Sequence, residues 1–332
     1  MKTRYIGNFL KVSALGLGCM GMTHAYGAPI SSGQIRNLIS KAIDFGYTFF
    51  DTAEIYGTAS NPHLNEEELG HALAPYRDRI VIGTKFGIHF DMSSSSVNKP
   101  LIPDAREVVI RKSVDESLKR LRTDHIDIYY QHRQDPNVPV EEVAEVMSSL
   151  IKEGKILSWG LSEVDAETIR RAHSICPVSA VQNRYSMMAR HYESVFSTLE
   201  ELNIALVAFS PMANGVLSGA YSANSQFDKN TDYRSSMPQF TEESMKANRP
   251  LFSLLNDFAN RKNATMGQIS LAWMLCKKPW IIPIPGTTKV ERLEENAKAS
   301  EIILSDSEVS AIDNALSDMK MSAVFGGSKI KS

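Results

Sequence analysis

Tyr47-Thr-Phe-Phe-Asp-Thr-Ala-Glu-Ile-Tyr-Gly57 is the stretch on which the fold and the site depend. The aromatic run Phe49-Phe50 indicates a buried strand, and this strand ends at a carboxylate, Asp51. Tyr56 follows five positions later, and Gly57 permits a turn after it. In parallel α/β folds the site is built at the carboxyl ends of the strands. Because an Asp at such a place more often caps the next helix, the remaining strands must decide whether a site is present.

Short apolar segments of the same kind recur along the chain. They are rich in Val, Ile, Leu or Phe and apolar on both faces, which is typical of parallel strands covered by helices. The predicted strands are residues 14–18, 48–51, 80–85, 126–131, 157–161, 180–183, 204–209 and 281–284. Amphipathic segments separate them and predict helices at 32–45, 66–76, 104–121, 140–151, 165–174, 193–202, 265–276 and 290–299.

Eight such pairs predict an α/β fold, a (β/α)₈ TIM barrel, as a single domain over residues 1–332. Residues 4–12 alternate around Gly7-Asn8 and predict an N-terminal β-hairpin, and the capping-box spacing of Ser305 and Glu308 predicts an extra C-terminal helix at 306–316. The alternative is an open doubly wound sheet. Gly16-Leu-Gly-Cys-Met-Gly21 fits its dinucleotide motif, but the acidic residue expected about 20 positions later is matched only by Asp44, on a helix.

Two long inserts interrupt the alternation, at residues 87–103 and 219–241. Both follow predicted strands, at the end of the barrel where loops contact substrates. We expect the serine run Ser93–Ser96 in the first insert to be a flexible loop.

The composition excludes several classes of protein. A hydrophobic content of 43% and a charged content of 22% are typical of a soluble globular protein, and a net charge of −2 gives no reason to expect nucleic acid or an anionic membrane as partner. Three cysteines without Cys-x-x-Cys spacing indicate a reducing compartment. With no apolar run near the roughly 20 residues of a membrane span and no signal-peptide cleavage site, we expect a cytoplasmic protein. The sequence leaves its oligomeric state open.

Four side chains stand where a barrel would bring them together. Asp51, Lys85 and His132 each end a predicted strand, and Tyr56 follows the first of these. A buried ammonium requires a carboxylate beside it, so we expect Lys85 to pair with Asp51. A phenol beside that cation should have a lowered pKa and donate a proton near neutral pH. The simpler alternative is an ion pair with a purely structural role. The other histidines lack ligand spacing, so no metal site is expected.

Several motifs together resemble the aldo-keto reductase family over essentially the whole chain. They are Leu15-Gly-Leu-Gly-Cys-Met-Gly21, Asp51-Thr-Ala-Glu-Ile-Tyr-Gly57, Thr84-Lys85, Gln131-His132, Gly160-Leu-Ser-Glu163, Val181-Gln-Asn-Arg-Tyr-Ser186, Phe209-Ser-Pro211 and Ile284-Pro-Gly-Thr287 with Glu295-Asn296. The resemblance implies reduction of a small carbonyl compound by hydride from a nicotinamide, with Tyr56 as general acid. Lys85 and Asp51 would tune Tyr56, and His132 would orient the carbonyl.

The resemblance also implies a cofactor path along the strand ends. Ser162 and Gln182 would hold the carboxamide, and Tyr185 would stack on the nicotinamide. Lys289 and Arg292, at the amino end of a helix, favour a 2′-phosphate and therefore NADPH/NADP+. The predicted cofactor-binding residues are Gly21, Met22, Asp51, Ser162, Gln182, Tyr185, Ser210, Pro211, Met212, Gly215, Leu217, Gly286, Thr287, Thr288, Lys289, Arg292, Glu295 and Asn296.

Two other functions remain open. A glycosidase barrel could use Asp51 and Glu54 as paired carboxylates, although they are three residues apart on one loop and leave Lys85 and the basic segment 286–292 without a role. A nucleotide-binding regulatory module with little turnover, as in the potassium-channel β-subunit relatives of the family, would keep the same four residues.

The expected substrate follows from the predicted pocket walls. These are Met22, Tyr26, Phe86, His89 and the insert 219–240, which offer no cluster of Arg or Lys. A buried anion without a cationic partner is costly, so we expect small uncharged aldehydes and dicarbonyls.

Overall fold

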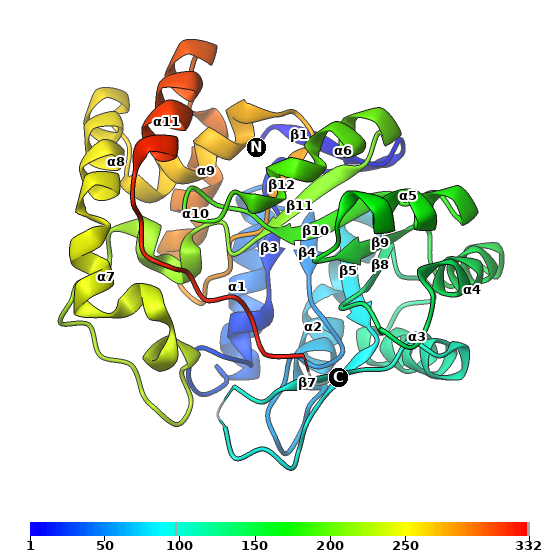
Figure 1. Ribbon diagram of the computed structural model, residues 1–332. Helices are drawn as coiled ribbons and strands as arrows, with labels where there is room; N and C mark the ends of the chain where they lie inside the picture. Colours follow the sequence, from blue (N-terminus) through cyan, green and yellow to red (C-terminus); the bar gives the residue numbers. More distant parts are fainter. Residues whose placement is uncertain (97, 331–332) are drawn as a thin grey trace.

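The computed structural model describes residues 1–96 and 98–330, and a parallel eight-stranded sheet curled into a barrel forms its centre (Figure 1). Backbone N–H groups of Gly16 and Gly18 donate to the carbonyl oxygens of Pro283 (3.0 Å) and Pro285 (3.3 Å), which joins the first strand to the last. A Cβ at Gly18 would lie 2.8 Å from the Ile284 carbonyl oxygen, so this close approach requires glycine. In sheet order the strands are β3 (Leu17–Gly18), β4 (Phe49–Asp51), β5 (Val81–Phe86), β8 (Ile128–Gln131), β9 (Trp159–Ser162), β10 (Ala180–Arg184), β11 (Ala205–Phe209) and β12 (Ile281–Pro283).

Helices cover the outside of the sheet, which confirms the predicted barrel. They bury their apolar stripes against the strands: α1, for example, begins with a Ser31/Gln34 capping box and buries Ile35, Leu38 and Ile39. The helices that follow the strands are α1 (Ser32–Asp44), α2 (Leu64–Leu73), α3 (Glu107–Leu121), α4 (Val140–Lys152), α5 (Ala166–Ile175), α6 (Phe196–Leu202), α9 (Met266–Lys277) and α10 (Val290–Lys298). The predicted additional helix is α11 (Asp306–Asp318), and the Ser305/Glu308 capping box is present.

The predicted N-terminal hairpin closes the amino end of the barrel. Strands β1 (Thr3–Ile6) and β2 (Leu10–Ser13) pair antiparallel. Ile6, Leu10 and Val12 of this hairpin pack with the apolar interior of the barrel, including Phe49 and Val207. Apolar side chains therefore seal this end, and among the described residues the carboxyl ends of the strands form the open side of the barrel.

The first insert differs from the prediction. Instead of a simple loop it contains an antiparallel pair, β6 (Ile88–Phe90) with β7 (Leu101–Pro103), and Ser93–Ser96 lie between these two strands. The C-terminal segment reaches this pair: it runs from α11 across the barrel toward β7 (Figure 1), where the Leu101 N–H donates to the Lys329 carbonyl oxygen at 2.8 Å.

The second insert continues into two helices that were not predicted, α7 (Glu242–Ala247) and α8 (Arg249–Lys262). The sequence contains the pattern that predicts α8, because Leu251, Leu255, Phe258 and Ala259 have helical spacing. All four side chains are buried in the structure. Two predicted helices, 66–76 and 193–202, are each divided between a 3₁₀ and an α segment. The 3₁₀ helices are η1 (Met20–Met22), η2 (Ala74–Arg79), η3 (His191–Val195), η4 (Ala213–Ser218), η5 (Tyr233–Ser236), η6 (Pro238–Phe240) and η7 (Ala299–Glu301).

Across residues 1–96 and 98–330, no helix has both the length and the apolar character that crossing a membrane requires.

Candidate active site

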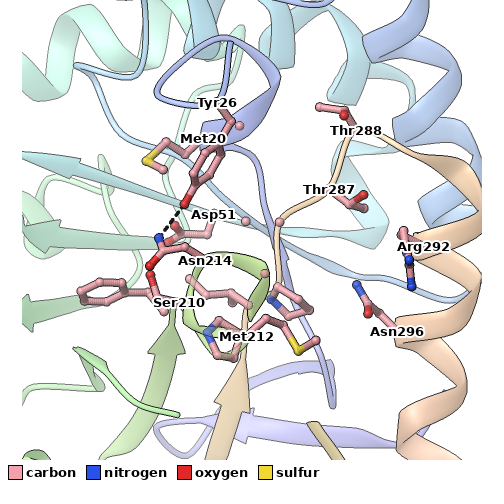
Figure 2. Close-up of a pocket in the computed structure, with 18 of the residues that line it drawn as sticks. Met20, Tyr26, Asp51, Ser210, Met212, Asn214, Thr287, Thr288, Arg292 and Asn296 are labelled. Carbon is pink, nitrogen blue, oxygen red and sulfur yellow. Dashed lines mark hydrogen bonds between the residues drawn. The ribbon is translucent and has the colours of Figure 1, made fainter. Parts of the chain in front are cut away.

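A cavity of ≈ 370 Å³ opens at the carboxyl ends of the strands and extends to the amino end of α10 (Figure 2). Alternation along the strands determines which side chains reach it. Phe49, Val81 and Ile128 fill the barrel interior. Asp51, Lys85 and His132 each follow one of these residues by an even number of positions. Their side chains therefore also point to the inside of the barrel. The predicted residues that line the cavity are Gly21, Asp51, Tyr56, His132, Ser162, Gln182, Ser210, Pro211, Met212, Gly215, Gly286, Thr287, Thr288, Lys289, Arg292, Glu295 and Asn296.

Asp51 and Lys85 form a buried ion pair at the bottom of the cavity. The Lys85 Nζ lies 2.6 Å from Asp51 Oδ1 and donates a second hydrogen bond of 2.6 Å to the Thr52 carbonyl oxygen. The other carboxylate oxygen of Asp51 accepts from Gln182 Nε2 at 2.7 Å. Burial lowers the pKa of Lys85, but Asp51 and Tyr56 outweigh this effect, and the pKa ends above its usual value. The ammonium therefore stays charged although only 1% of its side chain is exposed.

Tyr56 lies between this ammonium and the imidazole of His132. Its ring centroid is 5.0 Å from Lys85 Nζ and 5.7 Å from the centroid of the His132 ring, which it meets edge-on at 83°. Burial raises the pKa of Tyr56 above its usual value, and the charge of Lys85 only partly opposes this. The expected lowered pKa was therefore wrong, because the burial of the phenol, although partial, outweighs the nearby cation. Tyr56 is a neutral phenol at neutral pH, which is the protonated form that a general acid needs.

His132 is a neutral imidazole. Burial lowers its pKa well below the usual value, and the charges of Arg133 and Lys85 lower it further. Its Nδ1 atom has no hydrogen-bond partner among the described residues. The ring also lines the cavity, where a neutral imidazole can hydrogen-bond an uncharged group.

The far end of the cavity is basic. Arg292 and Asn296 extend from α10 toward the cavity, and Thr287 and Thr288 lie on the loop before the helix (Figure 2). Arg292 forms an ion pair with Glu295, and Lys289 forms none with any described residue. The amino end of a helix with cations beside it is a site suited to an anion.

Three predicted cofactor residues lie outside the cavity. Met22, Tyr185 and Leu217 are at most 1% exposed and belong to the core between strands and helices. The Tyr185 ring stacks on Trp273, with centroids 5.4 Å apart, and its hydroxyl donates to Glu193 Oε1 at 2.7 Å. Its assignment to the nicotinamide was therefore wrong. Tyr185 is an odd number of positions from Gln182, so it points to the opposite face of the sheet, a signal that the sequence contained.

Phe209 is the aromatic side chain at the end of β11 that does line the cavity. It stands two positions after Val207, which faces the barrel interior. The same alternation along the strand could therefore have identified it.

Other lining residues were missed because they come from loops far apart in sequence. Asn214 Nδ2 donates to the Tyr26 hydroxyl at 2.7 Å (Figure 2), and Gln239 Nε2 donates to Asn214 Oδ1 at 2.8 Å. Asn214 and Gly215 both have left-handed backbones, with φ of 60° and 104°. These contacts tie the loop after β11 to the loop after β3 across the cavity.

The predicted pocket wall is also corrected. Phe86 is fully buried and His89 exposed, and neither lines the cavity. Arg133 and Arg234 do line it. Arg234 lies over the ring of Tyr26 at 5.0 Å and is paired with Asp232 at 2.6 Å. Arg234 belongs to the predicted insert, whereas Arg133 was not among the predicted wall residues, so the expected wall without a cluster of Arg or Lys misses this second cation.

Glu54 does not line the cavity and cannot act with Asp51 as a pair of catalytic carboxylates. Its Oε1 accepts from the Gly87 N–H at 3.1 Å, which ties the loop of Tyr56 to the end of β5. Burial and the neighbouring Glu66 raise the pKa of Glu54 to about 7. No group of three or more His, Cys, Asp or Glu that could hold a metal ion occurs in the part of the chain that the structure describes.

Glu54→Gln should change how stability depends on pH. The pKa of Glu54 is raised on folding, so the folded state binds the proton more tightly and the wild type loses stability as pH rises from 4.5 to about 7. Gln does not ionise and can still accept from Gly87. The variant should gain up to about 3 kcal/mol relative to wild type across this window. Urea unfolding on either side of the window measures this, and an equal difference at both pH values would contradict it.

Comparison with known proteins agrees with this geometry. The model of the Aldo/keto reductase family matches residues 14–317. This chain belongs to the aldo/keto reductase family, an oxidoreductase family whose members generally carry out NADP-dependent carbonyl reduction on a TIM barrel.

Relatives match over most of their length. Probable aldo-keto reductase 1 from Glycine max is 38% identical over 311 residues, which cover 92% of this chain and 86% of that protein. Aldo-keto reductase yakc, whose name specifies NADP(+), from Schizosaccharomyces pombe is 38% identical over 319 residues, covering 94% and 91%. The structure of the glycerol dehydrogenase AKR11B4 from Gluconobacter oxydans superposes with a TM-score of 0.85 at 26% identity and covers 98% of both chains.

Proposed function

We propose that this protein is an NADPH-dependent reductase of aldehydes and ketones with Tyr56 as its general acid. The observation that carries the proposal is the buried Asp51–Lys85 pair beside the neutral phenol of Tyr56, at one end of a cavity whose other end is basic. The lining residues fit a dinucleotide: polar strand ends at Ser162, the Phe209 ring, a glycine-containing loop and the amino end of α10.

The nicotinamide, when bound, supplies a hydride to the carbonyl carbon, and the protein supplies the proton for the oxygen. Tyr56 donates its hydroxyl proton to that oxygen, and the ammonium of Lys85 stabilises the phenolate that remains. Asp51 fixes the ammonium, and Gln182 fixes Asp51 through its 2.7 Å hydrogen bond. Neutral His132 orients the carbonyl without competing for the proton.

The protein should bind NADPH at least tenfold more tightly than NADH. The 2′-phosphate would meet Lys289 and Arg292, and each charge-assisted contact contributes about 1.5–3 kcal/mol. The NADP(+) in the name of the Schizosaccharomyces pombe relative is consistent with this preference. Fluorescence titration of the wild type and of Arg292→Ala with both cofactors measures the ratio of the two affinities.

Arg292→Ala should weaken NADPH binding at least tenfold and NADH binding much less, because it also frees the Glu295 carboxylate to repel the phosphate. Arg36→Ala, on an exposed position of α1, is the matched control. Equal affinity of the wild type for the two cofactors would contradict the assignment, and so would unchanged NADPH affinity in Arg292→Ala.

A regulatory module with little turnover would bind the same cofactor. The two functions differ in one measurement, oxidation of NADPH that depends on an added aldehyde. Tight NADPH binding without such oxidation over a panel of aldehydes and ketones would overturn the proposed reductase.

A further inference from the structure

Among the described residues, most of the cationic side chains at or beneath the cavity wall are paired with a carboxylate. Lys85 is paired with Asp51, Arg234 with Asp232 and Arg292 with Glu295. His132 is neutral because its pKa is lowered. The remaining cations of the lining, Lys289 and Arg133, form no ion pair with any residue in 1–96 or 98–330.

These two unpaired cations lie in different parts of the cavity. Lys289 precedes α10, where the proposed function places the 2′-phosphate. Arg133 follows His132 directly, and its Nη1 donates to the His132 carbonyl oxygen at 2.6 Å and to Ser162 Oγ at 3.2 Å. Arg133 lines the same cavity as Tyr56 and His132, the two groups that would contact the carbonyl, and its charge acts to lower the pKa of both. Arg133 therefore belongs to the substrate end of the site.

A second guanidinium strengthens the positive field there. Arg184 lies over the Phe209 ring at 5.3 Å and is 3.6 Å from its carboxylate partner Glu163. Gly327 of the C-terminal segment lies beside both arginines: a Cβ at this position would be 3.2 Å from Arg184 Nη2 and 3.9 Å from Arg133 Nη2. Arg133 and Arg184 carry two positive charges and Glu163 one negative charge, which leaves one positive charge uncompensated.

A partly buried guanidinium without a carboxylate partner is less well solvated than one at the open surface, so an anionic ligand that pairs with it is stabilised. Its planar fork matches a carboxylate, which accepts two parallel N–H donors. The Nε and Nη2 donors of Arg133 have no hydrogen-bond partner in the described part of the chain, so both are available. A single excess charge fits a monoanion.

We infer that the preferred substrates are aldehydes or ketones that carry a carboxylate, and that Arg133 binds this carboxylate while the carbonyl lies between Tyr56 and His132. This inference rests on the proposed function and replaces the expectation of uncharged substrates. Hydride transfer and protonation are unchanged: the carboxylate only holds the substrate in place.

Two substrates of nearly equal shape test the inference. 4-Carboxybenzaldehyde carries the anion, and methyl 4-formylbenzoate carries a neutral ester at the same position. With NADPH, the wild type should show a kcat/KM at least about tenfold higher for the acid. Arg133→Met should lower this acid-to-ester ratio at least about tenfold, and Arg133→Lys should retain part of it. Arg36→Met, on the exposed face of α1, is the matched control and should keep the wild-type ratio.

Binding separates this inference from the proposed function. The alcohol products, 4-(hydroxymethyl)benzoate and its methyl ester, are titrated into the protein with NADP+, which requires no turnover. One outcome is that the protein binds the acid selectively, that Arg133→Met abolishes this binding, and that neither aldehyde is reduced. This outcome would overturn the proposed function and support the anion site. Reduction of both aldehydes with a ratio near one that Arg133→Met leaves unchanged would overturn the anion site alone. NADPH affinity that falls in step with the acid-to-ester ratio would also overturn it, because Arg133 would then serve the cofactor.

Discussion

Tyr56→Phe should reduce the rate of carbonyl reduction by about 10²–10⁴-fold, the usual contribution of a general acid. Phe keeps the ring and its contacts with His132 and Lys85 but has no proton to donate. NADPH affinity and thermal stability should stay close to those of the wild type, so the loss should appear in kcat. Single-turnover oxidation of bound NADPH by an excess of aldehyde measures the chemical step directly.

Tyr76→Phe is the control for this substitution. Tyr76 lies in η2, which precedes β5 at the amino end of the barrel, away from the cavity. The Tyr76→Phe protein should retain the wild-type rate of carbonyl reduction. If the Tyr56→Phe protein keeps most of the wild-type rate, another group donates the proton and the assignment is wrong.

Lys85→Met should lower turnover at least as much as Tyr56→Phe and should also destabilise the fold. The ammonium is the ion-pair partner of Asp51 and lies 5.0 Å from the Tyr56 ring centroid. Removing one partner of a buried ion pair costs about 3–5 kcal/mol, because the other charge remains buried and uncompensated. Chemical denaturation of the wild type and the variant measures this loss.

The double variant Lys85→Met/Asp51→Asn separates stability from catalysis. Replacing the orphaned carboxylate by a neutral amide should recover most of the lost stability and none of the activity. The single variant should also become more stable as pH falls. Burial raises the pKa of Asp51 above its usual value, and Lys85 opposes this effect. Without the ammonium the pKa lies still higher, so folding takes up a proton. A single variant that is as stable as the wild type at every pH would contradict the role of the ion pair.

Local patterns in the sequence determined the order of strands and helices, the N-terminal hairpin and the extra helix. Each of these follows from interactions between neighbouring residues, such as helical spacing, capping boxes and apolar strand segments. The meeting of Asp51, Lys85 and His132 could also be predicted, because the ends of all parallel strands in a barrel converge at one opening. For the same reason most of the predicted cofactor residues lie at the cavity.

Strand alternation, which the sequence also contains, would have corrected one assignment. It places Tyr185 outside the barrel and Phe209 inside it. The helix α8 likewise has a spacing that could have been recognised before the structure was known.

Only the tertiary structure decided the remaining features, because they depend on contacts between segments far apart in the chain. Asn214 meets Tyr26, 188 positions away, and Gly327 lies beside Arg133 and Arg184. The pKa of Tyr56 depends on how completely the folded chain excludes water from its hydroxyl, which no pattern of neighbouring residues specifies. The uncompensated positive charge at the substrate end of the cavity also depends on contacts between distant segments. Arg133 is visible in the sequence, but whether a carboxylate neutralises it is decided by which side chains the fold brings within a few ångströms of it.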